Sequence, residues 1–236
     1  MEKIRINKYL AQLGVDSRRA IDKMIEEGKI KVNGMTAESG MKVDDNDKIL
    51  INGKPINREK GKKVYFILNK PKKVLTTVKD ERGRKTVVDL IDTEERIFPI
   101  GRLDYDTEGL LILTNDGEVF NKVIHPRTEV YKTYLVEAKG NINMTTLNKL
   151  KRGIMLDNQM TLPAKAKIIS SDDNHTVLHF AIKEGRNRQV RRMFEMVGHN
   201  VISLKRIMVG ELTLDGLKVG EYRPLTKKEV KYLYSL

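Results

Sequence analysis

A short acidic loop between two apolar runs constrains the fold of this chain more than any other feature of its sequence. The loop lies within the stretch from Gly101 to Gly117, and its carboxylates belong to Asp104, Asp106 and Glu108. The flanking runs are Ile97 to Ile100 and Leu110 to Leu113. Short apolar runs bounded by Gly and Asn-Asp-Gly turn signals predict two strands joined by a loop. Loops held by rigid strands often carry catalytic groups, so this loop is the first candidate for a functional site.

The charge of the chain favours a polyanionic partner. Its 236 residues include 45 Lys and Arg against 32 Asp and Glu, which gives a net charge of +13 and a pI near 9.7. Neutralising phosphates releases counterions, so a basic protein binds nucleic acid whatever the base sequence. A charge excess alone fits a generic solvated surface equally well, and its distribution has to decide.

The composition predicts a folded protein of one large domain or two smaller ones, since 39% of the residues are hydrophobic. The absence of cysteine excludes disulfides, thiolate metal sites and a thiol nucleophile. No apolar run approaches the length of a membrane span, and the first residues carry no apolar targeting core, so we expect a cytoplasmic protein. The four histidines are scattered without metal-ligand spacing.

Residues 1 to 50 predict a small module of two helices and a hairpin. The first helix is indicated by apolar residues on one face before Gly14, and the second begins after Asp16 or Ser17 and ends at Gly28. Asn33-Gly34 provides a tight hairpin turn between short alternating segments. The polar side of the module is a predicted phosphate-binding face, with Arg5, Lys8, Arg18, Arg19 and Lys23 as candidate RNA-binding residues. Taken alone, these residues fit a solvated helix face as well.

Residues 51 to 63 are polar, contain two glycines and a proline, and are interpreted as a linker. A second domain then covers residues 64 to 236. We expect strands at 64–68, 131–136, 164–170 and 176–183, and helices that end near Ile124, span 143–152 and begin after Thr226.

A basic helix near the C-terminal side of this domain concentrates positive charge. In the run from Glu184 to Phe194, one apolar stripe is predicted to face the core, with Arg188 and Arg192 opposite it. Arg191 lies at the margin of the stripe and is placed to be half-buried. The alternatives for Arg191 are an ion pair with Glu195 one turn later, or plain solvation.

Several of these segments resemble known families. The Gly101–Gly117 stretch resembles the active-site loop of pseudouridine synthases, most closely the RsuA/RluB-type bacterial rRNA branch, and residues 3 to 50 resemble the RNA-binding domain named after ribosomal protein S4. The resemblance implies that Asp104 is the essential catalytic residue. It also implies that Tyr134, in a Lys-x-Tyr motif, is an active-site residue, and that Arg191 pairs with Asp104. Without the family match, packing would be the preferred interpretation of a strand tyrosine.

The resemblance implies an α+β protein: a small N-terminal α/β RNA-binding module, followed by a mixed, mainly antiparallel-sheet catalytic domain with a central cleft. It implies rRNA or a pre-ribosomal particle as partner, a monomer, and no metal, nucleotide or other cofactor. The Lys70-Pro71 pair matches a supporting motif of the family, but Lys73 stands where the family carries Gly, which leaves the shape of that turn open.

The implied reaction leaves two roles open for Asp104, which attacks the anomeric carbon or takes the neighbouring ribose proton. Either role requires an ionised carboxylate, and Arg191 is the expected counter-charge. Tyr134 would stack on the uracil and help remove the proton from its carbon. Arg102 would fill the position that the flipped base leaves. The further expected RNA contacts are Arg186, Arg188 and Arg192.

Other interpretations remain at this level. Asp104, Asp106 and Glu108 imitate the first half of a calcium loop, but position twelve is Asn115 where a bidentate Glu is needed. A glycosidase or N-ribosyl hydrolase would use related chemistry and release free uracil. A non-catalytic ribosome-associated factor would keep the N-terminal module but would not need Asp104, Tyr134 and Arg191 together. Within the synthases, we favour large-subunit rRNA as substrate.

Overall fold

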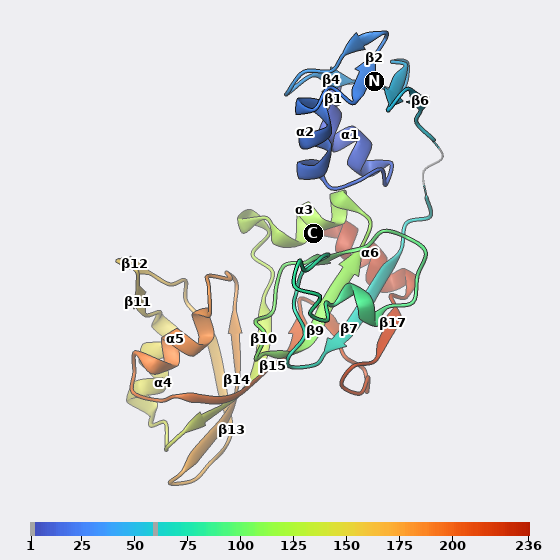
Figure 1. Cartoon of the computed structure of the whole chain (residues 1–236). Helices are drawn as coiled ribbons and strands as arrows, with labels where there is room; N and C mark the ends of the chain where they lie inside the picture. Colours follow the sequence, from blue (N-terminus) through green and yellow to red (C-terminus); the bar gives the residue numbers. More distant parts are fainter. Residues whose placement is uncertain (1–2, 59–60) are drawn as a thin grey trace. The chain divides into compact units, whose positions relative to one another are not determined.

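The structure, a computed structural model, describes residues 3–58 and 61–236 (Figure 1). The chain forms two compact units. The first extends to Val64 and includes residues 94–96 and 115–117, and the second comprises Tyr65–Thr93, Ile97–Thr114 and Glu118–Leu236.

The first unit packs two helices against short strands. Among its described residues, β3, β2, β5 and β6 form a four-stranded sheet in that order, and β1 pairs with β4. Ser17 begins the second helix by accepting a hydrogen bond from Ala20 N, as the sequence predicted. The elements are β1 (Ile4–Arg5), α1 (Ile6–Gln12), α2 (Arg18–Glu26), β2 (Ile30–Val32), β3 (Met35–Thr36), β4 (Lys42–Val43), β5 (Ile49–Ile51) and β6 (Lys54–Pro55).

The expected linker is wrong for its first residues. Ile51 ends β5, and Leu50 pairs with Pro55 of β6, so the chain makes one more hairpin before it leaves the first unit. Asn52 and Gly53 both have positive φ, 51° and 77°, which is the geometry of a tight hairpin turn. The rest of the expected linker includes residues 59 and 60, which lie outside the described residues.

The second unit is built on a mixed, mainly antiparallel sheet. Among the described residues it has nine strands, in the order β13-β14-β10-β15-β9-β7-β17, with β16 paired to β15 and β8 to β9. In the described part of the chain, only the β15–β9 pairing of this sheet is parallel. Its strands are β7 (Tyr65–Lys70), β8 (Phe98–Ile100), β9 (Glu108–Thr114), β10 (Lys132–Lys139), β13 (Lys165–Ser171), β14 (His175–Ile182), β15 (Val201–Val209), β16 (Leu212–Thr213) and β17 (Tyr222–Pro224). A separate hairpin consists of β11 (Met155–Leu156) and β12 (Gln159–Met160).

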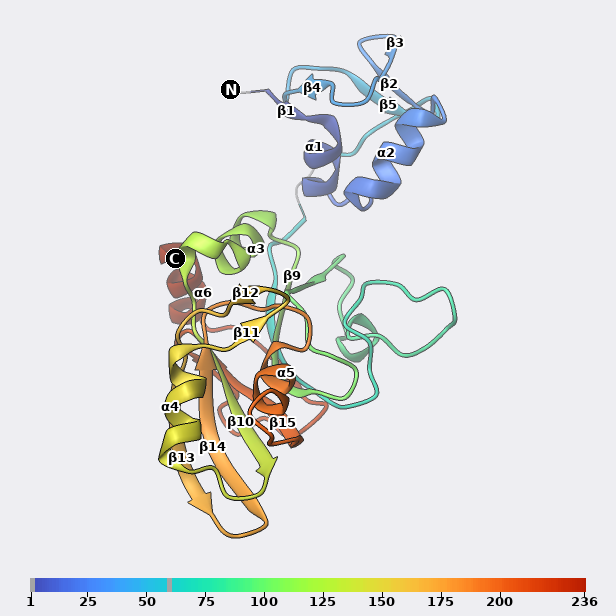
Figure 2. The same cartoon turned by 90° about the vertical axis from the view of Figure 1, so that its left-hand side faces the viewer.

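The helices of the second unit begin where their capping residues stand. Asn143 caps α4 (Met144–Arg152) by accepting from Thr146 N, and Thr226 with Glu229 forms the predicted capping box of α6 (Lys227–Ser235). In Figure 2, α4 and α5 (Gln189–Glu195) lie side by side over the part of the sheet that contains β10, β13 and β14. The remaining helices are α3 (Gly117–Ile124) and two short 3-10 helices, η1 (Val88–Leu90) and η2 (Pro126–Thr128).

Candidate active site

The acidic loop lies between two paired strands, as the sequence predicted. β8 and β9 are antiparallel partners, with Phe98 opposite Thr114, and the loop joins their ends. Thr107 N donates to Asp104 O at 3.1 Å, which closes a turn over the reactive stretch. Thr76 Oγ1 donates to Leu103 O at 2.6 Å from a neighbouring loop. The backbone around Asp104 is therefore fixed, while its side chain remains 30% exposed.

A buried lysine holds this turn through hydrogen bonds to its carbonyl oxygens. Lys70 is fully buried at the end of β7, and its Nζ donates to three carbonyl oxygens, those of Pro71 at 2.9 Å, Asp104 at 3.2 Å and Thr107 at 3.0 Å. An ammonium group has three N–H donors, so this arrangement satisfies all of them. Burial lowers the pKa of Lys70 to about 8, against the opposing effect of the carboxylates of Asp104 and Asp106. Lys70 is not among the site residues expected from the sequence, although the Lys70-Pro71 pair was a signal for it.

The turn that follows Lys70 keeps a glycine-like backbone without glycine. Lys73 has φ of 64°, in the left-handed region, and its N–H donates to Tyr105 O at 2.7 Å. A non-glycine residue in this region carries a strain of about 1–2 kcal/mol. The departure from the family pattern at this position therefore leaves the turn intact and ties it to the acidic loop.

Gly109 allows the parallel pairing that follows the loop. It lies opposite Arg206 of β15, and a Cβ on Gly109 would meet Arg206 O at 2.2 Å and Arg206 N at 2.6 Å. The Arg206 side chain is buried, and its Nε donates to Leu110 O at 2.7 Å. Arg206 thus joins the first residues of β9 to β15 through both its backbone and its side chain. No local sequence signal indicated this role.

Tyr134 lies in register with the same arginine. It is buried on β10, opposite Arg206 of β15 on one side and Phe180 of β14 on the other. Because Arg206 also pairs with Gly109, the tyrosine lies two strand spacings, roughly 10 Å, from the residue that follows the acidic loop. The pairing of the sheet thus places Tyr134 in the neighbourhood of the loop.

The cations around the loop are arranged differently from our expectation. Arg191, only 13% exposed, has Nε 3.3 Å from Asp106 Oδ2, and its Nη2 donates to Asp106 O at 3.1 Å. The ion pair that reaches Asp104 comes from Arg188, with Nη1 4.0 Å from Oδ2, and Arg188 also donates to both oxygens of Asp106. The expected pair of Arg191 with Asp104 is thus replaced by one with Asp106.

The backbone conformation just before α5 explains which arginine reaches Asp104. Arg188 has φ of 48° and lies just before α5. Its side chain therefore does not follow the helical periodicity that predicted a position on the outer face. Burial alone would raise the pKa of Asp106, but the hydrogen bond from Arg188 and the charge of Arg191 together lower it. Burial lowers the pKa of Arg191, and Asp106 opposes that shift.

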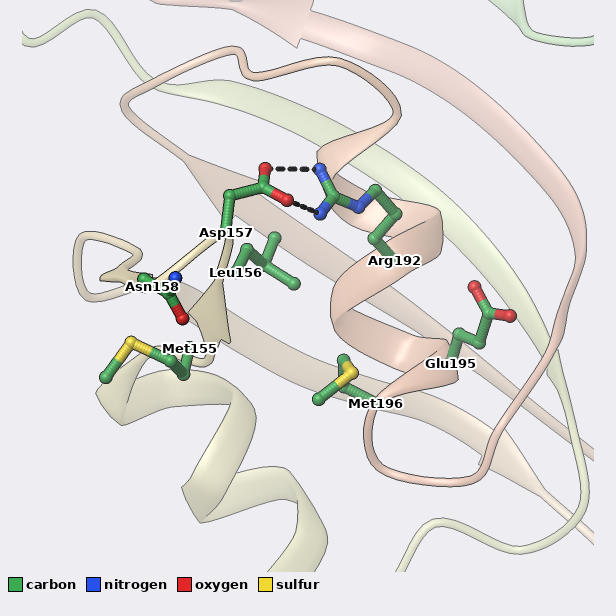
Figure 3. Close-up of a pocket in the computed structure, with 7 residues that line it drawn as sticks. All are labelled: Met155, Leu156, Asp157, Asn158, Arg192, Glu195 and Met196. Atoms are coloured by element: carbon green, nitrogen blue, oxygen red, sulfur yellow. Dashed lines mark hydrogen bonds and ion pairs between the residues drawn. The ribbon is translucent and has the colours of Figure 1, made fainter.

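Two of the arginines that we expected to contact RNA instead bind other groups of the protein. Arg192 makes two hydrogen bonds to Asp157, of 2.9 and 2.6 Å, across a hollow of about 340 Å³ between the β11–β12 hairpin and α5 (Figure 3). Arg186 donates to the carbonyls of Gln159 at 3.0 Å and Met160 at 2.8 Å. Both arginines therefore hold the hairpin, and the hollow contains none of the acidic-loop residues.

The other expected RNA-binding residues are exposed. Arg102 lies in the second unit, two residues before Asp104, and its side chain is exposed. In the first unit the expected RNA-binding residues Arg5, Lys8, Arg18, Arg19 and Lys23 are all exposed.

Within the described residues, no group of three or more His, Cys, Asp or Glu side chains is arranged to hold a metal ion. None of the helices described is long and apolar enough to cross a membrane.

These features define a two-domain protein in which a basic module precedes a sheet domain with a rigid acidic loop. Comparison with known proteins identifies the class. The family described as RNA pseudouridylate synthase matches residues 64–196, and the S4 domain matches residues 4–49.

Relatives match almost the full chain. The chain is 50% identical to the ribosomal large subunit pseudouridine synthase B of Bacillus subtilis, covering 98% of this chain and 96% of that protein. It is 36% identical to the dual-specificity RNA pseudouridine synthase RluF of Salmonella typhi, covering 98% and 79%. A crystal structure of a pseudouridylate synthase superimposes with a TM-score of 0.71 at 31% identity, covering 98% and 99%. The chain belongs to the RNA pseudouridine synthase family and carries an N-terminal S4 domain, which makes it an RNA-binding isomerase.

Proposed function

We propose that this protein converts a uridine of large-subunit ribosomal RNA to pseudouridine, with Asp104 as the catalytic group. The observation that carries the proposal is the geometry of Asp104, whose backbone oxygen is held by Lys70 and Thr107 while its carboxylate stays partly exposed. A group fixed in this way pays little ordering cost when substrate binds. The choice of large-subunit rRNA is supported by the named activity of the Bacillus subtilis relative.

In the proposed reaction, the bond between uracil N1 and the ribose C1′ breaks, the base turns over, and a bond forms between C1′ and C5. Asp104 either attacks C1′ and is displaced when C5 bonds to C1′, or takes the neighbouring ribose proton and returns it afterwards. At the end the proton on C5 leaves and the freed N1 takes up a proton. The C5 proton is therefore lost to water, whichever role Asp104 has. Tyr134 is the proposed stacking partner of the uracil and the group that assists removal of this proton.

The contacts assign the two arginines separate tasks within the proposal. Arg188 is the cation beside the Asp104 carboxylate, with its Nη1 4.0 Å from Asp104 Oδ2. Arg191 holds Asp106 by side chain and backbone, and so acts on the shape of the loop.

The S4 domain, to which we assign residues 1 to 50, supplies affinity for the RNA through its exposed Arg and Lys side chains. We place the remaining domain at residues 64 to 236. Arg102 is proposed to occupy the gap left by the flipped uridine. The protein works as a monomer in the cytoplasm and needs no cofactor in this proposal.

The test uses a large-subunit rRNA transcript tritiated at uracil C5. We expect the wild-type protein to release tritium without releasing free uracil, and Asp104→Asn to release none while binding RNA nearly as well. The amide has the same shape but is neither nucleophilic nor basic at neutral pH. Asp172→Asn, in the exposed β13–β14 turn, is the matched control and should keep full activity.

The outcomes separate the competing functions. Free uracil among the products would make the protein a hydrolase, and RNA binding without tritium release would make it a non-catalytic factor. Tritium release by a pure Asp104→Asn preparation would remove Asp104 from the catalytic role.

A further inference from the structure

An exposed aromatic ring lies inside the acidic loop and has no task in the proposed reaction. Tyr105 follows Asp104 directly, and it is 49% exposed. Its backbone is fixed, because its carbonyl accepts from Lys73 N at 2.7 Å and the turn closes around it from Thr107 N to Asp104 O. The backbone of Tyr105 is therefore fixed, while its ring is partly exposed next to the proposed catalytic residue in the sequence.

A basic loop, residues 75–87, is joined to the acidic loop by a hydrogen bond from Thr76 Oγ1 to Leu103 O at 2.6 Å. It is closed at its base by hydrogen bonds from Leu75 N to Lys85 O at 3.0 Å and from Val87 N to Leu75 O at 2.9 Å. Within it, Asp80 accepts four hydrogen bonds from Arg82 and Arg84. Arg84 is the main cause that lowers the pKa of Asp80 to about 2, so this carboxylate stays ionised and keeps the loop in shape.

Arg84 is one of the exposed cations of this basic loop. The Arg84 side chain is 51% exposed, and the hydrogen bond to Asp80 is the first cause that raises its pKa. Between Lys70 and Lys85 the chain carries seven Lys and Arg against two acidic residues. Tyr105 therefore lies between the carboxylates of the acidic loop and a strongly basic neighbouring segment.

An open aromatic face combined with fixed cations is the arrangement that binds single-stranded nucleic acid, because every base stacks and every nucleotide carries a phosphate. A protein partner would be the alternative occupant. The charge of this segment favours the polyanion, and a uridine turned out of its helix leaves its neighbours partly unstacked beside the site.

We propose that Tyr105 stacks on a base next to the target uridine and that Arg84 binds the adjacent phosphate. This inference rests on the proposed function, since the neighbour is defined by the uridine at Asp104. Tyr105 is in this view a determinant of substrate binding that does not take part in the bond changes.

The first experiment uses fluorescence, because the chain contains no tryptophan. Tyr105→Trp places a single indole at the site, and Ile169→Trp places one on the exposed surface of β13, where Ile169 is 51% exposed. On titration with the large-subunit rRNA transcript, we expect Tyr105→Trp to lose most of its emission and Ile169→Trp to keep it. Unchanged emission of Tyr105→Trp, at RNA concentrations where filter binding shows saturation, would overturn the proposal.

The second experiment measures KM and kcat by tritium release from the same transcript. Tyr105→Phe should match the wild type, whereas Tyr105→Leu should raise KM about ten-fold, within the range found for single stacking contacts, with kcat changed by less than about two-fold. Arg84→Gln should raise KM and reduce its salt dependence. Equal KM values for the Leu and wild-type proteins, or equal losses for Phe and Leu, would contradict ring stacking.

The two readouts distinguish this inference from the proposed function. Quenching without tritium release would leave the nucleotide site standing and remove the assigned reaction or substrate. Tritium release without quenching or a change in KM would leave the reaction standing and remove the nucleotide site.

Discussion

Replacing Lys70 by Met tests whether a buried, partly neutralised lysine holds the acidic loop. Methionine has a similar volume and is apolar, so it fills the space but leaves the carbonyls of Pro71, Asp104 and Thr107 without their donor. Two opposing effects follow. Lost hydrogen bonds destabilise the folded state by about 1–3 kcal/mol per unsatisfied buried group, whereas removing a desolvated charge stabilises it.

The pKa sets the size of the second effect. A shift of Lys70 from 10.5 to about 8 means that charging this lysine costs about 3 kcal/mol more in the folded protein than in the unfolded chain. Between these two values the unfolded state binds more protons, so the contribution of Lys70 to stability rises with pH. Its contribution below about pH 8 is the least favourable, and it improves by about 2–3 kcal/mol between pH 7 and pH 10.

The assay is urea unfolding of wild type and Lys70→Met at pH 7 and pH 10, combined with tritium release at pH 7. We expect the stability advantage of the wild type to increase by about 2–3 kcal/mol from the lower to the higher pH, because other titrating groups cancel in the difference. The exposed Lys72→Met is the matched control and should show no such increase. We also expect Lys70→Met to lower kcat, since small displacements of a catalytic group can reduce rates about a hundred-fold.

One outcome would refute this reasoning directly. If the stability difference between wild type and Lys70→Met is the same at both pH values, Lys70 does not titrate with a lowered pKa. Full activity of Lys70→Met would show that the Asp104 turn keeps its shape without the ammonium group.

Further substitutions test the other contacts of the loop. Gly109→Ala should destabilise the protein by about 3 kcal/mol or more, because its Cβ would lie 2.2 Å from Arg206 O in the β9–β15 pairing; an unchanged melting temperature would show that the pairing relaxes freely. Arg188→Gln should reduce single-turnover tritium release more than stability, because Arg188 is the cation beside the proposed catalytic carboxylate. Arg191→Gln should instead lower stability by about 1–3 kcal/mol by leaving Asp106 without its buried partner, and the reverse pattern would exchange the roles of the two arginines.

The sequence predicted the elements whose signals are local. Asn143 and Thr226 begin helices because their side chains cap the first N–H groups, and Asn33-Gly34 turns a hairpin because both positions adopt positive φ. Asn52-Gly53 carries the same hairpin signal, and interpreting it as part of a linker missed information that the sequence contained. The acidic loop was likewise visible, since short strands flank it directly.

Only the tertiary structure revealed what holds that loop. Lys70 is 34 residues from Asp104 in the chain and reaches its carbonyl because β7 and β9 are neighbours in the sheet. The choice between Arg188 and Arg191 depended on a left-handed residue before α5, which helical periodicity cannot indicate. Local structure follows from the interactions of neighbouring residues, whereas the partners of a buried charge are set by how distant strands pack. The sequence by itself therefore determined the acidic loop and the family, and the packing of the sheet decided which cations contact the loop.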